Sequence, residues 1–460
     1  MGDTYYEQLY FKLTQHFYHK FEDFITRKWC NCRLNEEISD DDRSHAYKNL
    51  YQEIKSAQIA NRQTVRKWFG IGGRCSIPSR ENVLKIALAT KMSVLEATEY
   101  LQYGISQPGL QENDYQEFII MYCLEHQYGL KKCQRMIEYY EQKSQFAGKW
   151  QQTSCTSWLH DQYDVVKDYS PEEILIWMHK NQKHFKGYSM TVLNCYRQLV
   201  EKCLTIFRSE TQAVLVRTLQ KEGFFEWLHA NGMGENYTSV EIERFVKNKL
   251  RSRKEPMTTQ SAKEIRNMLA VVYASHDRMS DLVVEIYSTM PGRKKNNGKF
   301  MIYNALEDQN QIKRVDNKYI SELLNIAILK EKQMVLQMEI AKESNEQLRK
   351  EKQKGLKKMK QRVHLIQRSD LLVLAQYIVY QQLVGEIEQD KMYCVESAQR
   401  EFREFADGIL EVCGMRKLDE SYMLDFVLLS CFDQEEMYLF GNVIEEMEIG
   451  GVGIIEIKSH

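Results

Sequence analysis

The chain has 460 residues, of which 43% are apolar and 28% are charged, and its formal net charge is −1. This composition is typical of a folded globular protein and excludes a chain that is disordered throughout. The sequence has no run of about 18 consecutive apolar residues, which excludes a predicted membrane-spanning helix. The near-zero net charge indicates no particular partner.

Helix is the predicted secondary structure for almost the whole chain. Only 5 prolines interrupt the 460 residues, and proline is the residue that most strongly breaks helices. We therefore predict an all-α fold. The first residues contain no basic region followed by an apolar run, and the 11 cysteines are scattered. These two features favour a reducing compartment, so we expect a cytoplasmic protein.

The first predicted element is one amphipathic helix over residues 4–28, in which apolar side chains recur every four residues. The nearby His16, His19, Cys30 and Cys32 are residue types that ligate zinc, but their spacing is not that of a zinc finger or ribbon. We expect the two histidines to pack against aromatic rings instead. The apolar stripe consists of Tyr5, Leu9, Leu13, Phe17, Phe21 and Ile25. The acidic stretch 36–42 then predicts a loop or a helix start.

Residues 60–101 carry the most informative pattern of the sequence. Between Asn61 and Arg80 there are five basic residues and no acidic one. Val65 and Trp68 are spaced to face a core, which leaves the polar side chains of a helix at 61–69 facing outward. Arginine and glutamine suit base edges, and arginine and lysine suit phosphates. The predicted DNA-contacting residues are Asn61, Arg62, Gln63, Thr64, Arg66, Lys67, Arg74 and Arg80.

This stretch resembles the second half of a Cro/C1-type, phage-repressor-like helix-turn-helix domain. The resemblance rests on a helix that ends at Trp68, on Pro78-Ser79 before the next helix, and on a Ser93-x-x-Glu96 motif. It covers about 50 residues. With residues 104–140 the region also resembles bacterial proteins common in anaerobic Firmicutes, in which such a domain is followed by a loop and an apolar helix. The resemblance implies a recognition helix at 61–69 whose first residues enter the major groove.

The stretch departs from the family pattern in two places. The turn from Trp68 to Pro78 is longer than usual and contains extra glycines, and Tyr47 to Ile59 lacks the usual signature of the preceding helix. A helical bundle with a solvated basic face is therefore the alternative interpretation. It implies an interaction or scaffold protein that keeps the fold without binding DNA.

An internal repeat links the two ends of the chain. Residues 110–125 align without gaps on residues 418–433, with Leu, Glu, Phe and Cys identical at four matched positions. Each copy follows a glycine, Gly104 or Gly414. The pattern indicates a helix, a glycine stop, a short loop and an apolar helix. Duplication of a helical module explains it, and so does a shared way of capping and packing two unrelated helical hairpins.

The middle of the chain begins after residues 144–169, which lack periodicity and which we interpret as a linker. Ser170 and Glu173 then form a predicted capping box with Pro171 at the first helical position. A compact basic run follows later, and it is either a phosphate-binding face or a solvated helix face. This secondary basic patch consists of Arg244, Lys247, Lys249, Arg251, Arg253 and Lys254.

Charge divides the C-terminal part of the chain. Residues 341–368 carry ten basic and three acidic residues, a net charge of +7, and residues 385–460 carry six basic and eighteen acidic residues, a net charge of −12. We interpret 317–384 as one long charged helical segment, of which residues 330–368 either pair as a coiled coil or form a lone connector helix in solvent. The acidic segment is a candidate for binding a protein partner.

The predicted architecture therefore has six parts. They are a helix-turn-helix-like domain (1–143), a linker (144–169), a helical middle domain (170–291), a basic turn region (292–316), a long charged helical segment (317–384) and an acidic C-terminal helical module (385–460) that repeats part of the first domain.

No catalytic, metal-binding or cofactor motif is recognisable in the sequence, which has no His-Glu-x-x-His, phosphate-binding loop or nucleophile elbow. Our leading hypothesis is a bacterial DNA-binding transcriptional regulator that recognises double-stranded DNA, and paired half-sites would favour a homodimer. The scaffold protein described above is the alternative, and a phage-defence effector is a further one.

Overall fold

The structure is a computed structural model, and it confirms the all-α fold class. It describes residues 5–30, 37–73, 75–144, 156–234, 236–253, 256–273, 279–287, 302–309, 311–313, 315–389, 392–434, 436–445 and 447. Within these ranges the only β-type pairing is an isolated antiparallel bridge between Phe432 and Met437. None of the described helices is both long enough and apolar enough to cross a membrane.

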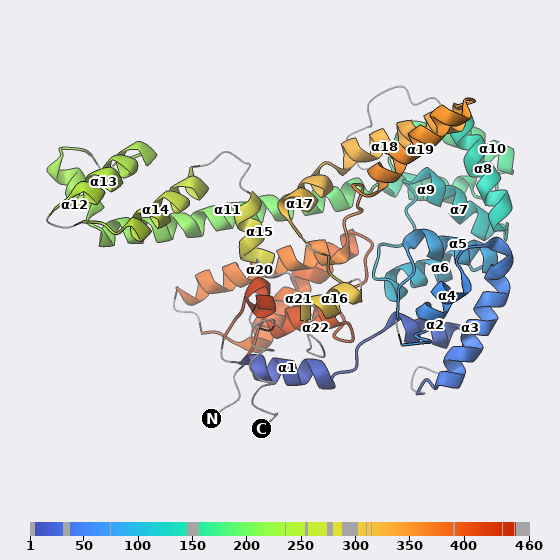
Figure 1. The fold of residues 1–460 in the computed structure, drawn as a ribbon, viewed down its shortest axis with the longest axis horizontal. Helices are drawn as coiled ribbons and strands as arrows, with labels where there is room; N and C mark the ends of the chain where they lie inside the picture. The colour runs from blue at the N-terminus through green and yellow to red at the C-terminus, as the bar shows by residue number, and fades with distance from the viewer. Residues whose placement is uncertain are drawn as a thin grey trace.

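The first of three hydrophobic cores unites the N-terminal helices, which lie on the right of Figure 1. It also takes in Met334 and Met338 from α18 (Ile326–Lys342), far along the chain. The helices of this core are α2 (Phe21–Cys30), α3 (Asp40–Ile54), α4 (Arg62–Trp68), α5 (Arg80–Thr90), α6 (Val94–Glu99), α7 (Tyr115–Glu125), α8 (Leu130–Lys143), α9 (Thr156–Val166) and α10 (Pro171–Lys180), with short turns η1 (Lys55–Ala57), η2 (Tyr100–Gly104) and η3 (Gln182–His184).

The predicted linker at 144–169 is wrong over its second half, because α9 lies there. Leu159, Tyr163 and Val166 of α9 are buried in the first core. The capping box of α10 is confirmed: the Ser170 side chain accepts from the Glu173 backbone, and the Glu173 carboxylate accepts from Ser170. Since α9 and α10 complete the first core, the N-terminal domain extends beyond residue 143, and the predicted middle domain is not one unit.

The second core lies at the centre and below it in Figure 1, and it joins residues from both ends of the described part of the chain. Its axis is the first part of α11 (Met190–Lys221), a helix of 32 residues. Helical residues 440–445 also belong to this core. Its further helices include α1 (Tyr5–Gln15), α15 (Met279–Tyr287), α16 (Ile302–Asp308), α17 (Asn317–Leu324), α20 (Arg368–Ile387), α21 (Val395–Val412) and α22 (Met423–Ser430).

The single helix predicted at 4–28 is in fact two helices, α1 and α2, which belong to different cores. Leu9 and Leu13 of α1 pack in the second core, whereas Phe21 and Ile25 of α2 pack in the first. Phe17 lies between the helices and is 71% exposed. The expected aromatic packing of the histidines is present, because His16 stacks on Phe426 and His19 lies 4.8 Å from the Tyr422 ring.

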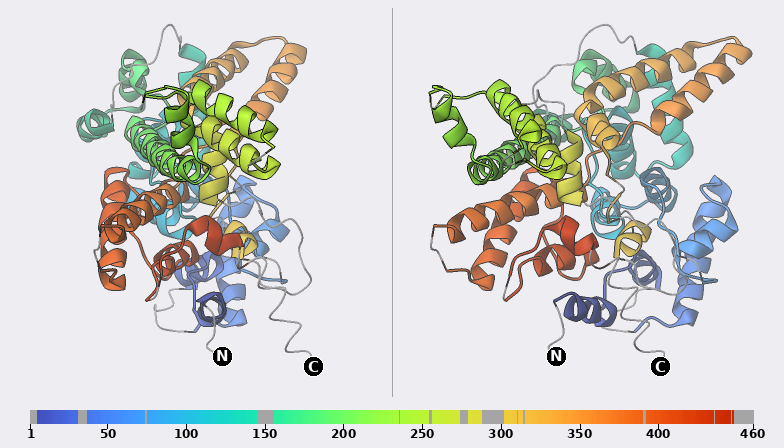
Figure 2. Two further views of the ribbon diagram at one scale, coloured as in Figure 1. Left: turned by 90° about the vertical axis from the view of Figure 1, so that its left-hand side faces the viewer. Right: turned by 60° about the vertical axis from the view of Figure 1, so that its left-hand side comes forward.

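The third core forms a small lobe at the far end of α11, on the left of Figure 1. Figure 2 shows this lobe standing clear of the other helices in a second direction. Leu215 and Leu219 of α11 pack against α12 (Phe224–Ala230), α13 (Ser239–Arg251) and α14 (Thr259–Val272). The long α11 therefore connects the lobe to the second core.

The long helical segment predicted at 317–384 is also wrong as a single element. It comprises α17, α18, α19 (Glu346–Lys360) and most of α20. Helices α18 and α19 form a hairpin, in which Lys352 of α19 forms ion pairs with Glu339 of α18 and with Glu343, the residue that follows α18. The segment is therefore not a lone connector helix in solvent, because α18 packs on α8 in the first core.

Candidate functional site

The predicted recognition helix is α4, and its position depends on a tight turn after α3. Helix α3 ends at Ile54, η1 follows, and Gln58 then adopts a left-handed conformation with φ 51°. The side chain of Asn61 caps α4 by accepting a hydrogen bond of 2.8 Å from the Thr64 N–H. This cap satisfies one of the free N–H groups at the start of the helix.

Helix α4 buries one face and exposes the other. Val65 and Trp68 are buried in the first core, as the sequence predicted. Arg62 and Gln63 are exposed, and Arg66 and Lys67 are half-buried. Asn61 and Thr64 are hydrogen-bonded to each other through their side chains, so they serve the cap of the helix. The outward basic surface of α4 therefore consists of Arg62, Gln63, Arg66 and Lys67.

Tyr47 of α3 orders the two arginines of this surface. Its hydroxyl accepts a hydrogen bond of 3.1 Å from Arg62 Nε, and its ring lies 6.0 Å from the guanidinium carbon of Arg66. Neither interaction pairs an arginine with a carboxylate. No carboxylate in the described ranges forms an ion pair with Arg62, Arg66 or Lys67. The positive charge of α4 is therefore directed to solvent.

Arg80 was predicted to contact DNA, and the structure contradicts this role. Its Nε and Nη2 each donate a hydrogen bond of 2.7 Å to the carboxylate of Glu117 on α7. Its Nη1 and Nη2 also donate to the carbonyls of Pro108 and Gly109, at 2.6 and 2.7 Å. Only 13% of the Arg80 side chain is exposed. All of its charged end is engaged inside the protein, which leaves nothing to present to a phosphate.

The second copy of the sequence repeat contains the same arrangement around Arg368, at the start of α20. Arg368 donates to both oxygens of Asp425 at 2.5 and 2.6 Å, and to the carbonyls of Arg416 and Lys417. In the alignment Asp425 corresponds to Glu117, and the two carbonyls correspond to those of Pro108 and Gly109. We call this arrangement the arginine clasp.

A second match concerns the loop before each apolar helix. Ser106 has φ 52° and Gly414 has φ 64°, and these two residues occupy corresponding positions in the ungapped alignment. The residue that corresponds to Gly414 is therefore Ser106 and not Gly104, the glycine that precedes the first copy. Sequence comparison also missed the two arginines, because they lie at different distances from the matched segments.

The secondary basic patch lies far from α4. Helix α13 buries Ile242, Phe245 and Val246 in the lobe and exposes its basic residues outward. Helix α13 and helix α4 lie at opposite ends of the molecule in Figure 1, so the two predicted basic surfaces do not form one site. Arg74 and Lys254 lie outside the described residues. Of the patch, Arg244, Lys247, Arg251 and Arg253 are exposed and Lys249 is half-buried.

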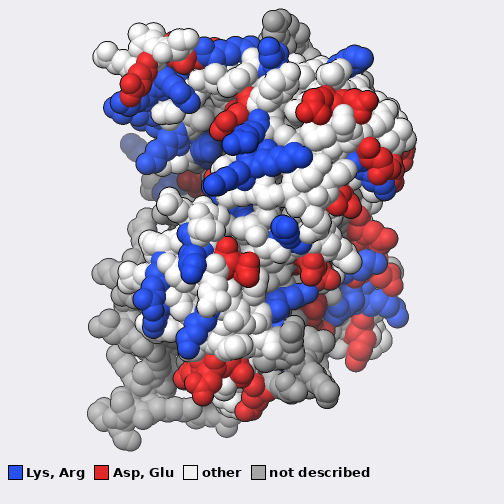
Figure 3. Space-filling model, turned by 90° about the vertical axis from the view of Figure 1, so that its right-hand side faces the viewer, with Lys and Arg blue, Asp and Glu red and all other residues white. Residues whose placement is uncertain are grey.

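Helix α19 adds basic charge at the same end of the molecule as α4. It carries seven Lys or Arg and two Glu residues, and it has no buried side chain. Figure 3 shows the face on the right of Figure 1, where Lys and Arg gather mainly in the upper left part and Asp and Glu along the right edge. Seven of the ten basic residues of 341–368 therefore lie on α19, in a hairpin that packs on the rest of the protein through α18, whereas Arg368 is buried in the arginine clasp.

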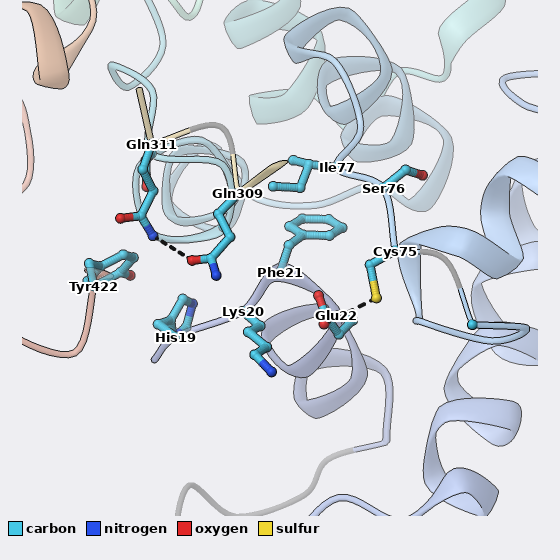
Figure 4. A pocket seen from close by; sticks show the side chains of 13 residues that line it. His19, Lys20, Phe21, Glu22, Cys75, Ser76, Ile77, Gln309, Gln311 and Tyr422 are labelled. Atoms are coloured by element: carbon cyan, nitrogen blue, oxygen red, sulfur yellow. Dashed lines mark hydrogen bonds between the residues drawn. The ribbon is translucent and has the colours of Figure 1, made fainter. Parts of the chain in front are cut away.

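A cavity of about 510 Å³ lies behind the turn that follows α4. Its walls come from residues 19–22 at the start of α2, from Gly73 and residues 75–77, and from Gly104 and Ser106 (Figure 4). Gln309, Gln311 and Tyr422 complete the lining. No motif of the sequence predicted this cavity. The extra glycines of the long turn were the available signal, since Gly70, Gly72 and Gly73 all have positive φ and Gly73 lines the cavity.

The chemistry of this cavity is polar and only weakly reactive. Cys75 donates a hydrogen bond of 3.3 Å to Glu22 Oε1, and burial together with that carboxylate raises the pKa of the thiol to about 11. A thiol with such a pKa is protonated at neutral pH and is a poor nucleophile. Burial also lowers the pKa of His19, which favours its neutral form. Within the described ranges, no group of three or more His, Cys, Asp or Glu residues is placed to hold a metal ion.

No protein-family model matches the chain, and no characterised protein or solved structure shows a significant similarity to it.

Proposed function

We propose that this protein binds double-stranded DNA through α4 and acts as a regulator of transcription. The observation that carries the proposal is the outward surface of α4. Two buried anchors, Val65 and Trp68, fix the helix while four side chains with donors for bases and phosphates face solvent. Buried anchors and an outward polar face are what a helix needs to enter a major groove as a rigid body.

The position of each of the four side chains on α4 indicates whether it contacts bases or phosphates. Arg62 and Gln63 lie in the first turn of α4, the end by which a recognition helix meets base edges. Arginine suits guanine and glutamine suits adenine in the major groove. Arg66 and Lys67 lie one turn later and supply charge for the phosphates. Tyr47 holds Arg62 by its Nε and leaves the two terminal nitrogens of the guanidinium for a base.

A helix of seven residues covers only a short stretch of DNA. Regulators with such helices pair them across a twofold axis and read two half-sites about 34 Å apart. A homodimer on a palindromic operator is therefore part of the proposal.

The test measures phosphate contacts first, because they do not require the operator. Fluorescence anisotropy with a labelled random-sequence duplex is recorded between 50 and 300 mM salt, for the full chain and for the double variant Arg66→Ala/Lys67→Ala. Log K falls as log salt rises, and each lost phosphate contact makes this line less steep by about 0.9. We therefore expect the variant to bind more weakly and its line to be less steep by about 2 per protomer.

The matched control is Arg244→Ala/Lys247→Ala, which removes the same charge from α13 in the lobe. It leaves the affinity and the slope unchanged if α4 is the interface. Absence of binding by the unmodified protein at 50 mM salt refutes the proposal, and so does an equal loss in both double variants.

A further inference from the structure

Helix α19 packs on α18 through one side and turns its other side to solvent. Its half-buried side chains are Lys352, Leu356 and Met359, which are spaced three or four residues apart and therefore share one side of the helix. Lys352 pairs with Glu339 of α18, so this side is the one that packs in the hairpin. Figures 1 and 2 show the hairpin at the edge of the molecule.

The outward side of α19 carries a row of lysines. Lys354, Lys357 and Lys358 are exposed there, and no carboxylate of the described residues forms an ion pair with any of them. Lys350 precedes them on the same side and pairs with Glu346, but these two side chains are 69% and 81% exposed. An ion pair so exposed to water contributes little, so the row presents positive charge along its whole length.

The stability of the helix accounts for only part of this row. Lysines in the last turn of a helix interact favourably with the helix dipole, which explains Lys357 and Lys358. Lys350 and Lys354 lie before the last turn, where this interaction fades. Packing does not require the row either, because no side chain of α19 is buried. The fold therefore leaves the charge of the row available to an anionic partner.

The length of the row fits the charge spacing of a nucleic acid. Lys350 and Lys358 are eight residues apart, and at about 1.5 Å per residue the row is about 12 Å long. One strand of B-DNA carries a phosphate about every 3.4 Å along the helix axis, so the row spans about three phosphates. Lysine is a compact point charge, which suits phosphate contacts that do not read a base.

The other side chains of α19 do not favour a membrane or a protein as the partner. A helix that lies on a membrane inserts its apolar side chains among the lipids, whereas Leu356 and Met359 lie on the side that packs on α18. Protein interfaces are commonly anchored by aromatic residues, and α19 contains none. A phosphate backbone is the partner that the outward side fits best.

The end of α19 links the row to the region of α4. Lys360, the last residue of α19, lines a cavity of about 390 Å³ together with Glu81 and Lys85 of α5. Helix α5 is the helix that follows α4 and its turn. The hairpin and α4 also lie at the same end of the molecule in Figure 1. The two basic surfaces therefore belong to one end of the protein.

We infer that the outward side of α19 binds the phosphate backbone of the DNA duplex, beside the groove that α4 enters. The inference rests on the proposed function, because the duplex bound by α4 is the ligand. Lys354, Lys357 and Lys358 make the contacts. Contacts to phosphates add affinity without sequence preference, so α19 strengthens the binding of a short recognition helix and leaves the choice of bases to α4.

Fluorescence anisotropy of the full-length protein with a labelled random-sequence duplex, recorded across a salt titration, tests the inference. The variant is Lys354→Gln/Lys357→Gln/Lys358→Gln, since glutamine keeps the helix propensity of lysine. We expect binding at the lowest salt concentration to weaken at least about tenfold, and the line of log K against log salt to be less steep by about 2.7 per protomer. Lys354→Arg/Lys357→Arg/Lys358→Arg keeps the charge and should bind like the unmodified protein.

The matched control removes three exposed charges from α13, at the opposite end of the molecule. Arg244→Gln/Lys247→Gln/Arg251→Gln should leave the affinity and its salt dependence unchanged. Circular dichroism of each variant checks that the helices are intact. The inference is overturned if the folded glutamine variant of α19 binds the duplex with unchanged affinity and salt dependence, or if the control variant loses as much.

Two comparisons separate this inference from its alternatives. Sedimentation with vesicles of phosphatidylcholine and phosphatidylserine tests a membrane: vesicle binding that the α19 variant loses while duplex binding stays unchanged overturns the inference. Arg66→Ala/Lys67→Ala tests α4 in parallel. If only the α19 variant weakens duplex binding, α19 is a DNA-binding surface and the recognition role of α4 is refuted. If only the α4 variant does, the proposed function stands and the inference fails.

Discussion

Arg80 and Arg368 show how the same residue type takes different roles according to its partner. Both begin a helix, and both donate to a carboxylate and to two carbonyls. From the sequence Arg80 belongs with the other basic residues near α4. Glu117, the residue that decides its role, lies 37 residues later. A side chain this far along the chain is placed by packing, which local pattern does not reveal.

The first prediction concerns the clasp of Arg80. Arg80→Ala leaves the Glu117 carboxylate buried and unpaired, which costs about 3–5 kcal/mol of the free energy of unfolding. Urea unfolding followed by tryptophan fluorescence measures this loss. Arg62→Ala, on the exposed surface, should cost less than about 1 kcal/mol. An Arg80→Ala variant with unchanged stability and weakened DNA binding would instead make Arg80 a DNA contact.

Asp370 gives a prediction of pH dependence. It lies fully buried at the start of α20, where burial raises its pKa to about 6 in spite of hydrogen bonds from the Gln367 N–H and the Tyr319 hydroxyl and the nearby charge of Lys313. The folded state therefore holds the proton more tightly than the unfolded state, whose carboxyl has a pKa of about 3.9. The stability contributed by the protonated acid is complete below about pH 4 and is lost as the pH rises through 6.

Asp370→Asn removes this titration. The difference in unfolding free energy, unmodified protein minus variant, should fall by about 3 kcal/mol between pH 4 and pH 7. Denaturant midpoints measured in parallel across this range give the difference directly. A flat difference would show that the carboxyl of Asp370 is ionised throughout.

At the scale of elements, the periodicity of the sequence predicted which side chains are buried better than it predicted which core they join. The stripe from Tyr5 to Ile25 is continuous in sequence, yet α1 and α2 separate at Phe17 and enter different cores. The two parts have the same local pattern, so only tertiary packing divides them. Capping was more predictable, because the Ser170–Glu173 box depends on neighbouring residues alone.

The lobe at the end of α11 supports a prediction at the element scale. Phe245 of α13 is fully buried there, and its ring lies 5.2 Å from Phe224 and 5.6 Å from Trp227. Phe245→Ala removes about 3–5 kcal/mol from this small core. Hydrogen exchange should lose protection in α12, α13 and α14 while α5 and α20 keep theirs.

Val240→Ala is the matched control on the same helix, because Val240 is 60% exposed. It should leave the exchange pattern unchanged. Loss of protection throughout the molecule in Phe245→Ala would show that the lobe and the other cores unfold together.

For the whole molecule, composition predicted the all-α class, but the sequence could not divide the chain into its cores. Each large core is assembled from distant segments, as Met334 and Met338 in the first core illustrate. At the candidate site, the outward residues of α4 followed from helical spacing and the anchors Val65 and Trp68. The cavity did not, because its walls meet only after the two cores have packed together.

The contact of α1 with the C-terminal repeat has a consequence for biosynthesis. Tyr5 donates its hydroxyl proton to the Ser430 carbonyl, 425 residues later, and stacks on Tyr438. A ribosome adds about 5–20 residues each second, so the first helix to emerge waits roughly 20 to 85 s for its docking surface. During that time Leu9 and Leu13 have no native core to enter. A nascent chain of this protein is therefore an expected client for chaperones that bind exposed apolar segments near the ribosome exit.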